Sequence, residues 1–274
     1  MNTTSERLAP VLYLPHGGGP LPLLGDPGHE ALTRFLQGAG ERLGTPSAIL
    51  VVSAHWEEDV AAVTAGDHPG LIYDYYGFPP ESYSLQYPAP GDPDLAETIR
   101  AMLSTAGIEA NLDRRRGFDH GLFVPLLLMY PAARIPCVQL SLLHSLDPAR
   151  HIAIGRALAG LRARNVLVIG SGMSFHNMRA LMAPGADSGG RDAAFADWLK
   201  ETCEAPGLTP AEREQRLVDW ERAPGARYCH PREEHLLPLH VCYGVASEAT
   251  PTGEAVFDDR VMGRRVTGIL WRSA

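Results

Sequence analysis

The sequence predicts an α/β fold in three layers, α/β/α, with helices on both faces of a central, mostly parallel, mixed sheet. Four short runs rich in Val, Ile and Leu have the pattern of strands buried on both faces: residues 10–15, 48–54, 136–142 and 166–171. Longer stretches with helical spacing of apolar residues lie between or after them, at residues 30–43, 94–106, 148–164 and 191–203. Strands that alternate with helices in this way indicate a largely parallel sheet.

Length and composition indicate a globular protein. The 274 residues suffice for a large core, and we take residues 1–274 as a single domain. Hydrophobic residues make up 45% and charged residues 20% of the chain, which excludes intrinsic disorder. The net charge of −8 provides no basic surface for phosphates, so we expect no nucleic-acid partner.

Targeting signals and cysteine motifs are missing from the sequence. No cationic segment followed by a long apolar one opens the chain, and no stretch is apolar over a membrane-spanning length, so we expect a cytoplasmic protein without membrane contact. The four cysteines form no CxxC pair, which predicts buried, reduced thiols. A homo-oligomer is compatible with the sequence, which does not give the oligomeric state.

Two segments are predicted to be irregular. Residues 66–93 are dense in Pro, Gly and Tyr, and we expect them to form a long ordered loop. Such loops often line binding sites, and a plain surface segment is the equal alternative. Residues 184–190 are predicted to be a flexible connection.

Histidines end three of the apolar runs. His16 is followed by three glycines, His55 ends the second run, and His176 follows the fourth. Ligands of open α/β sheets bind beyond the carboxyl ends of the strands, so these three side chains can converge. A single histidine in this position is more often structural, but three together favour a metal site.

A second group of histidines lies near the C-terminus, at 230, 235 and 240. On a helix, a five-residue spacing turns each successive side chain by about 140°, so the three cannot face one ion. We favour His235 as the ligand, because the preceding glutamates and Pro238 indicate a helix start there. His240 lies among apolar residues and is expected to be a packed core histidine.

His120 stands between Asp119 and Gly121, before an apolar stretch with helical character at residues 122–130. Asp119 needs no other role than to cap this helix. His120 gains nothing from burial between these neighbours, and an active-site acid/base is as good an interpretation as a structural one.

These stretches together resemble the DOPA-dioxygenase branch of the class III (LigB-type) extradiol ring-cleavage dioxygenases. The similarity covers nearly the whole chain and is specific through the order and spacing of its motifs: PHGGGP at 15–20, VSAHW at 52–56, GFP at 77–79 with YPAPG at 87–91, GFDHG at 117–121 and EHLLPL at 234–239. The family more usually has Ser after a His-Gly pair, whereas Gly18 and Gly19 stand here.

The resemblance implies one divalent metal ion per chain, with His16, His55 and His235 as ligands. His176 is then either a fourth ligand or the nearby base, and His120 is an acid/base beyond the ligands. Iron(II) is expected for catalysis, and zinc(II) is the expected contaminant of the isolated protein because nitrogen sites bind it more tightly.

Other branches of the family use two histidines and one carboxylate, which makes Glu234 the alternative third ligand. The implied substrates are a small aromatic diol and dioxygen. We also expect the loop from Tyr73 to Pro90, with Tyr75 and Tyr76, to form a wall of the substrate pocket, and core packing is the alternative role for its tyrosines. Two competing hypotheses are a zinc-dependent hydrolase on the same fold and a catalytically silent metal-binding protein.

Overall fold

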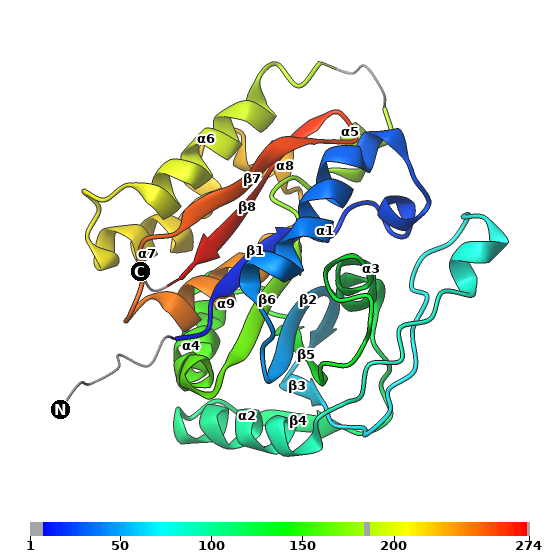
Figure 1. Ribbon diagram of the computed structural model, residues 1–274. Helices are drawn as coiled ribbons and strands as arrows, with labels where there is room; N and C mark the ends of the chain where they lie inside the picture. Colours follow the sequence, from blue (N-terminus) through cyan, green and yellow to red (C-terminus); the bar gives the residue numbers. More distant parts are fainter. Residues whose placement is uncertain (1–7, 184–186, 273–274) are drawn as a thin grey trace.

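The computed structural model describes residues 8–183 and 187–272, which form one eight-stranded sheet in the order β4-β3-β5-β2-β6-β1-β8-β7 (Figure 1). The four central strands are parallel, as predicted: β5 (Cys137–Leu143), β2 (Ala48–Glu58), β6 (Val166–Gly172) and β1 (Val11–Pro15). Their carboxyl ends therefore meet along one edge of the sheet.

The outer strands make the sheet mixed. On one side β3 (Ala61–Thr64) pairs antiparallel with β5 and parallel with β4 (Ala110–Asp113). On the other side β8 (Arg264–Trp271) is antiparallel to β1, and β7 (Glu254–Val261) is antiparallel to β8. The expected mostly parallel, mixed sheet is confirmed.

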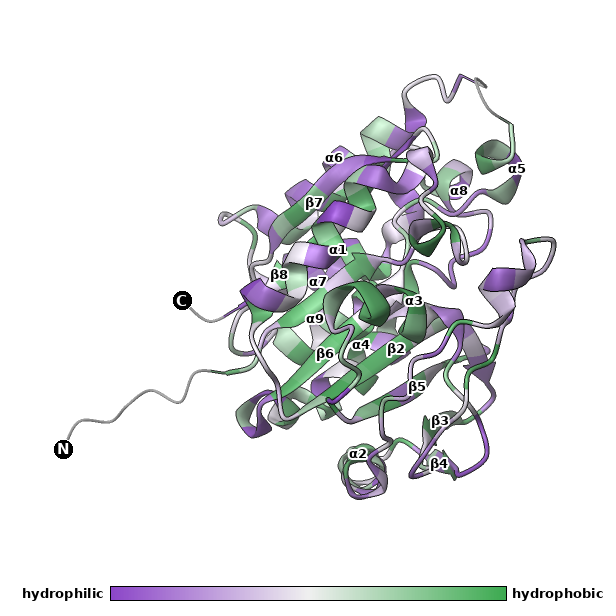
Figure 2. Ribbon diagram, turned by 45° about the vertical axis from the view of Figure 1, so that its right-hand side comes forward, coloured by the Kyte–Doolittle hydropathy of each residue, from purple (hydrophilic) through white to green (hydrophobic). Residues whose placement is uncertain are grey.

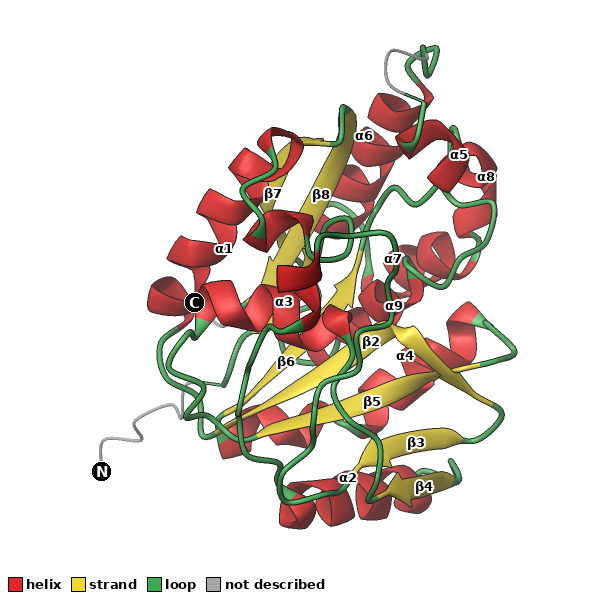
Figure 3. Ribbon diagram, turned by 90° about the vertical axis from the view of Figure 1, so that its right-hand side faces the viewer, coloured by secondary structure: helices red, strands yellow, loops and turns green. Residues whose placement is uncertain are grey.

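Helices cover both faces of the sheet (Figures 1 and 3). One face carries α1 (Glu30–Leu43) and α3 (His120–Met129), which pack against each other. The opposite face carries α2 (Pro93–Thr105), α6 (Arg191–Glu204) and α9 (Leu237–Ala246), with α4 (Pro148–Ala157) against α9 and α7 (Pro210–Val218) against α4 and α6. The predicted three-layer architecture is confirmed.

Short helices complete the chain, and one of them corrects the expected helix at residues 148–164. That segment is divided into α4 and a 3-10 helix, Ala159–Arg164, which ends at Asn165 in a left-handed conformation with φ of 56°. Gly160 weakens helix formation there, and the chain must turn into β6. The other short helices are α5 (Met178–Leu181), α8 (Ala226–Cys229) and 3-10 helices at Leu21–Leu23, Pro27–His29, Pro80–Tyr83 and Trp220–Arg222.

The segment at residues 66–93 is an ordered arm with little regular structure, as expected (Figure 1, cyan). Isolated bridges tie its two ends to the body of the protein, one between Leu71 and Phe118 and one between Gly91 and Cys137. The second predicted irregular segment, 184–190, lies partly outside the described residues, since the structure describes it only from 187 onward.

The core lies between the sheet and its two helical layers. Figure 2 shows hydrophobic residues concentrated along β2, β6 and α3, and more hydrophilic ones on outer helices such as α6. All four cysteines are buried free thiols, which confirms the expectation. Among the described residues, no helix combines the length and apolar character needed to cross a membrane.

Candidate metal centre

Histidines from five separate segments meet at the carboxyl ends of the central strands. His16 directly follows β1, His55 lies near the end of β2, and His176 follows β6. His120 opens α3, and His235 lies in the turn before α9. The structure thus brings together all the histidines predicted for the site.

The imidazole rings lie in direct contact. The rings of His16 and His55 are 4.9 Å apart between centroids, and their Nε2 atoms face each other at 3.0 Å. His235 lies 5.2 Å from His16 and 4.8 Å from His55, and His120 lies 3.9 Å from His55. His176 stacks on His235 with 3.3 Å between centroids.

An oxygen atom faces the Nδ1 atom of each of three rings. Ser171 Oγ lies 3.1 Å from Nδ1 of His16, and Glu234 Oε1 lies 2.9 Å from Nδ1 of His235. Asp74 Oδ2 is more distant, 3.7 Å from Nδ1 of His55. Metal-binding histidines usually have such a partner on the nitrogen that does not bind the metal, so this donor set fits a divalent ion.

Burial keeps these imidazoles neutral. The pKa values of His16, His55 and His235 are well below the usual value, first because burial disfavours the charged form and then because the imidazoles crowd one another. Nearby carboxylates only partly offset this for the pKa of His55. A neutral imidazole is the form that binds a metal, so these side chains are ready as ligands at neutral pH.

Asp74 is a site residue that the sequence did not reveal. Its Oδ1 atom accepts hydrogen bonds from Nδ1 of His120, at 2.9 Å, and from the backbone N–H of His120, at 3.0 Å. Burial opposes ionisation, but the hydrogen bond and the charges of His120 and His55 outweigh it and lower the pKa of Asp74 to about 2. The ionised Asp74 therefore accepts from His120 and fixes the orientation of its ring.

Glu234 serves two histidines with one oxygen. Its Oε1 atom lies 2.9 Å from Nδ1 of His235 and 2.9 Å from Nδ1 of His176. Burial would raise the pKa of Glu234, but the hydrogen bond and charge of His176 prevail and lower it. An ionised carboxylate only accepts, so both histidines donate from Nδ1, and the neutral His235 then has its lone pair on Nε2.

Potential ligand atoms form two adjacent groups. His16, His55 and His120 are one set whose ligand atoms lie within 4.8 Å of one another, and His176, Glu234 and His235 are the other. The two sets touch, since the rings of His55 and His235 are in contact. Geometry alone therefore admits more than one choice of third ligand beside His16 and His55.

The remaining C-terminal histidines face the backbone. Nε2 of His230 lies 3.0 Å from the carbonyl oxygen of Ser174, and Nε2 of His240 lies 2.8 Å from that of Leu217. His240 is fully buried in α9, which confirms the expected core role. Since α9 begins at Leu237, His235 precedes the helix by two residues, close to the predicted helix start.

Of the two tyrosines predicted to border the substrate pocket, only Tyr75 lies near the histidines. The ring of Tyr75 lies 5.7 Å from His120 and 5.5 Å from Phe78. Phe78 in turn packs on Gly19, which has a positive φ of 57° that favours glycine. Tyr76 is 88% exposed, so the structure supports Tyr75 but not Tyr76 as part of the wall.

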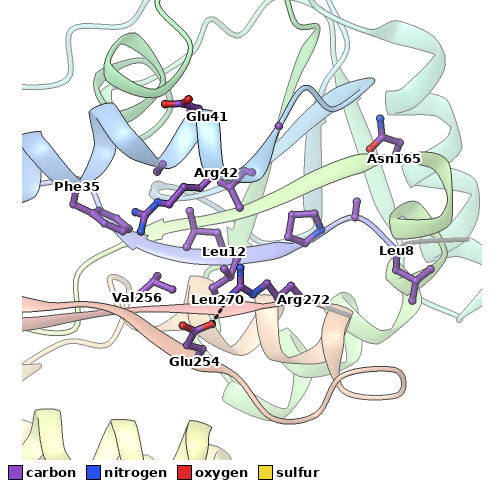
Figure 4. Close-up of a pocket in the computed structure, with 15 residues that line it drawn as sticks. Leu8, Leu12, Phe35, Glu41, Arg42, Asn165, Glu254, Val256, Leu270 and Arg272 are labelled. Atoms are coloured by element: carbon purple, nitrogen blue, oxygen red, sulfur yellow. Dashed lines mark hydrogen bonds and ion pairs between the residues drawn. The ribbon is translucent and has the colours of Figure 1, made fainter. Parts of the chain in front are cut away.

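A cavity of about 520 Å³ lies at the other end of the sheet and is distinct from the histidine cluster (Figure 4). It is bordered by Pro10 before β1, by the end of α1, and by Leu270 and Arg272 at the end of β8. Its described lining includes no histidine or cysteine. We therefore locate the chemistry at the histidine cluster, at the carboxyl ends of the strands.

The chain belongs to the LigB family. Residues 13–266 match the family described as the catalytic LigB subunit of aromatic ring-opening dioxygenase. The matched range includes all five histidines of the cluster, and it confirms the resemblance that the sequence motifs indicated.

Several similar proteins are named as dioxygenases. The chain is 42% identical to the dioxygenase tasH of Hapsidospora irregularis, over 90% of this chain and 81% of that one. It is 37% identical to a 4,5-DOPA dioxygenase extradiol of Beta vulgaris, over 89% and 90%, and 40% identical to one of Escherichia coli K12, over 86% and 84%. The crystal structure of an uncharacterized protein from Escherichia coli K12 superposes with a TM-score of 0.76 at 32% identity, covering 96% of this chain and 99% of that one.

The protein is thus a non-haem, metal-dependent extradiol dioxygenase that opens aromatic rings. The family and the relatives favour this activity over the hydrolase and over the silent metal-binding protein. The buried histidines fit the metal dependence of the family.

Proposed function

We propose that His16, His55 and His235 bind one divalent ion through their Nε2 atoms, and that the ion is iron(II) during catalysis. The observation that carries this proposal is the contact between the Nε2 atoms of His16 and His55, at 3.0 Å, with the Nδ1 side of all three rings facing an oxygen. Two facing imidazole nitrogens have little reason to approach unless they share a proton or an ion.

His235 is preferred to His120 and Glu234 as the third ligand. His120 faces Asp74 of the arm with both its backbone N–H and its Nδ1 atom, and the family resemblance implies that it lies beyond the ligands as an acid/base. Glu234 accepts hydrogen bonds from two imidazoles, which occupies the oxygen nearest to the cluster. His235 is buried and neutral, with its Nε2 lone pair available.

Iron(II) held by these three histidines would supply the chemistry that activates a catechol and dioxygen together. We propose that His176 is the base, because Glu234 holds its Nδ1–H and leaves Nε2 free to accept a proton from a catechol hydroxyl. We propose that His120, held at Nδ1 by Asp74, is the acid that returns a proton to the oxygen that develops negative charge. Tyr75 and Phe78, whose rings pack edge to face, are proposed to border the aromatic ring of the substrate.

The proposed substrate is a catechol of the DOPA class, and the proposed catalytic domain is the whole of residues 1–274. Several relatives are named 4,5-DOPA dioxygenase extradiol, and they match most of this chain. We propose zinc(II) as the ion that the protein retains on purification, because the site consists of neutral imidazoles and zinc outcompetes iron(II) at such sites.

The test is anaerobic loading with iron(II), followed by oxygen uptake measured with DOPA, catechol and protocatechuate. We expect stoichiometric oxygen consumption and a yellow semialdehyde product, fastest with DOPA, and no turnover with zinc in place of iron. Oxygen uptake with none of the three catechols, or ester hydrolysis supported by zinc, would contradict the proposal.

A further inference from the structure

Arg232 lies at the rim of the histidine cluster between two carboxylates. Its Nη1 and Nη2 atoms contact Oε1 and Oε2 of Glu57, each at 2.5 Å, and Nη1 also lies 3.4 Å from Oε2 of Glu234. We propose that Arg232 is a positioning residue, which holds Glu234 so that its other oxygen serves both His176 and His235. This inference rests on the proposed metal site.

The guanidinium connects two of the three segments that carry the proposed ligands. Glu57 belongs to β2, two residues after His55, and Glu234 directly precedes His235. These two segments are far apart in sequence and share no strand pairing, so Arg232 joins them where they face each other. Glu57 also lies 3.4 Å from Nδ1 of His144, which follows β5, but this second contact is with a largely exposed ring.

The two oxygens of Glu234 have separate partners. Oε1 accepts from Nδ1 of His176 and His235, and Oε2 faces the guanidinium of Arg232. A carboxylate without a partner on Oε2 can rotate and exchange its oxygens, and each rotation breaks the bonds that fix both imidazole tautomers. The planar guanidinium is suited to prevent this because Glu57 pairs with it through two bonds and sets its plane.

A purely structural role predicts a different result from a positioning role. The side chain of Arg232 is 48% exposed, and ion pairs at exposed positions contribute little to stability. Replacing Arg232 should therefore leave the fold intact. Loss of a direct partner of a metal ligand typically lowers metal affinity by roughly 10–100-fold, and because Arg232 acts through Glu234 we expect a loss at the lower end, roughly 10-fold.

The experiment compares Arg232→Met with Arg232→Lys and with Arg227→Met as a matched control. Arg227 is exposed to a similar extent, 43%, and pairs with Glu221 and Glu233 but not with Glu234. The readouts are zinc(II) affinity by competition with a chromophoric chelator, the visible spectrum of the cobalt(II)-loaded protein, and the melting temperature of the metal-free protein.

We expect Arg232→Met to bind zinc roughly 10-fold more weakly and to change the cobalt spectrum, with an unchanged melting temperature. Lysine should restore part of the affinity, because it keeps the charge but not the planar pairing. Arg227→Met should match the wild type. If Arg232→Met does not fold, Glu57→Gln decides the question, and we expect a smaller loss of affinity in the same direction.

If Arg232→Met has the affinity and spectrum of the wild type, the positioning role is wrong but the metal site stands. The same holds for Glu57→Gln if that variant is the one that decides. Failure of the wild type itself to bind zinc or cobalt would instead contradict the proposed function. An equal loss in Arg227→Met would show a general charge effect and would also overturn the assignment.

Discussion

Two groups of histidines differ in what their ring nitrogens face. The histidine cluster lies at the carboxyl ends of the strands, and a second pair, His151 and His240, lies in the helical layer of α4 and α9. His16 and His235 of the cluster are buried, as are His151 and His240, and burial lowers the pKa of all four, to about 4 for His151. Burial and a lowered pKa therefore do not distinguish a metal ligand from a core residue.

Partner chemistry does distinguish them. His151 donates from Nδ1 to the carbonyl of Asp147, at 2.7 Å, and accepts at Nε2 from the backbone N–H of Leu143, at 3.1 Å. Each nitrogen thus has a backbone partner, which leaves none for an ion. In the cluster, the partners of the Nδ1 atoms are side chains instead of backbone groups, and the Nε2 atoms of His16 and His55 face each other.

The largest expected effect separates His235 from His240. His235→Ala should abolish metal retention and activity, as should the same change at His16 or His55, because each removes a ligand. His240→Ala removes only a contact with the backbone and should keep the metal. Elemental analysis of the purified variants provides the measurement. If His235→Ala keeps its full complement of metal, or if only His240→Ala loses the metal, the assignment of His235 as the ligand and His240 as a core residue is wrong.

A smaller effect is expected for His176, which belongs to the cluster but is proposed to act as a base. His176→Ala should retain the metal and lower kcat by roughly 10²–10⁴-fold, the usual contribution of acid/base assistance. Turnover of iron-loaded protein with DOPA and its metal content are measured on the same sample. Loss of the metal together with activity would identify His176 as a fourth ligand instead.

Changes to His151, in the helical layer, should alter the free energy of unfolding rather than metal binding. The folded-state pKa of His151 is about 4, below its usual value of 6.5, so the unfolded chain binds the proton more readily. Stability is fully present above pH 6.5 and is lost as the pH falls toward 4, by up to about 3 kcal/mol. Urea unfolding of metal-free protein at several pH values should show a smaller decline for His151→Gln. Equal pH dependence in both proteins would rule out this contribution.

The smallest effect concerns the aromatic arm beside the cluster. Tyr75→Ala should raise the KM for DOPA by roughly 3–10-fold with metal content unchanged, since an aromatic contact contributes about 0.5–1.5 kcal/mol. Tyr76→Ala is the matched control, because this neighbouring ring is exposed. Initial-rate kinetics decide whether the arm belongs to the site, and equal KM values for both variants and the wild type would exclude it.

Much of the fold could be predicted, because the central strands are continuous apolar runs and the helices have clear periodicity. The histidines could be found for the same reason, since His16 and His55 lie at the ends of such runs. The strand pair β7 and β8 was not predicted. β7 is an edge strand with largely exposed polar residues, and its apolar signal is weak.

The partners of the histidines could not be predicted. Asp74 lies in an irregular segment, 46 residues from His120, and nothing local signals that contact. Ser171 was counted only as part of a strand, although its hydroxyl faces His16. Contacts of this kind depend on the register between β1 and β6 and on the path of the arm, which arise only in the folded chain.

Anomalous diffraction from crystals of the zinc-loaded protein tests the central claim most directly. We predict one zinc ion per chain at the carboxyl ends of the strands, bonded to Nε2 of His16, His55 and His235 at about 2.1 Å. Zinc bonded to His120 in place of His235, or held by His176 and Glu234 away from His16 and His55, would contradict the account.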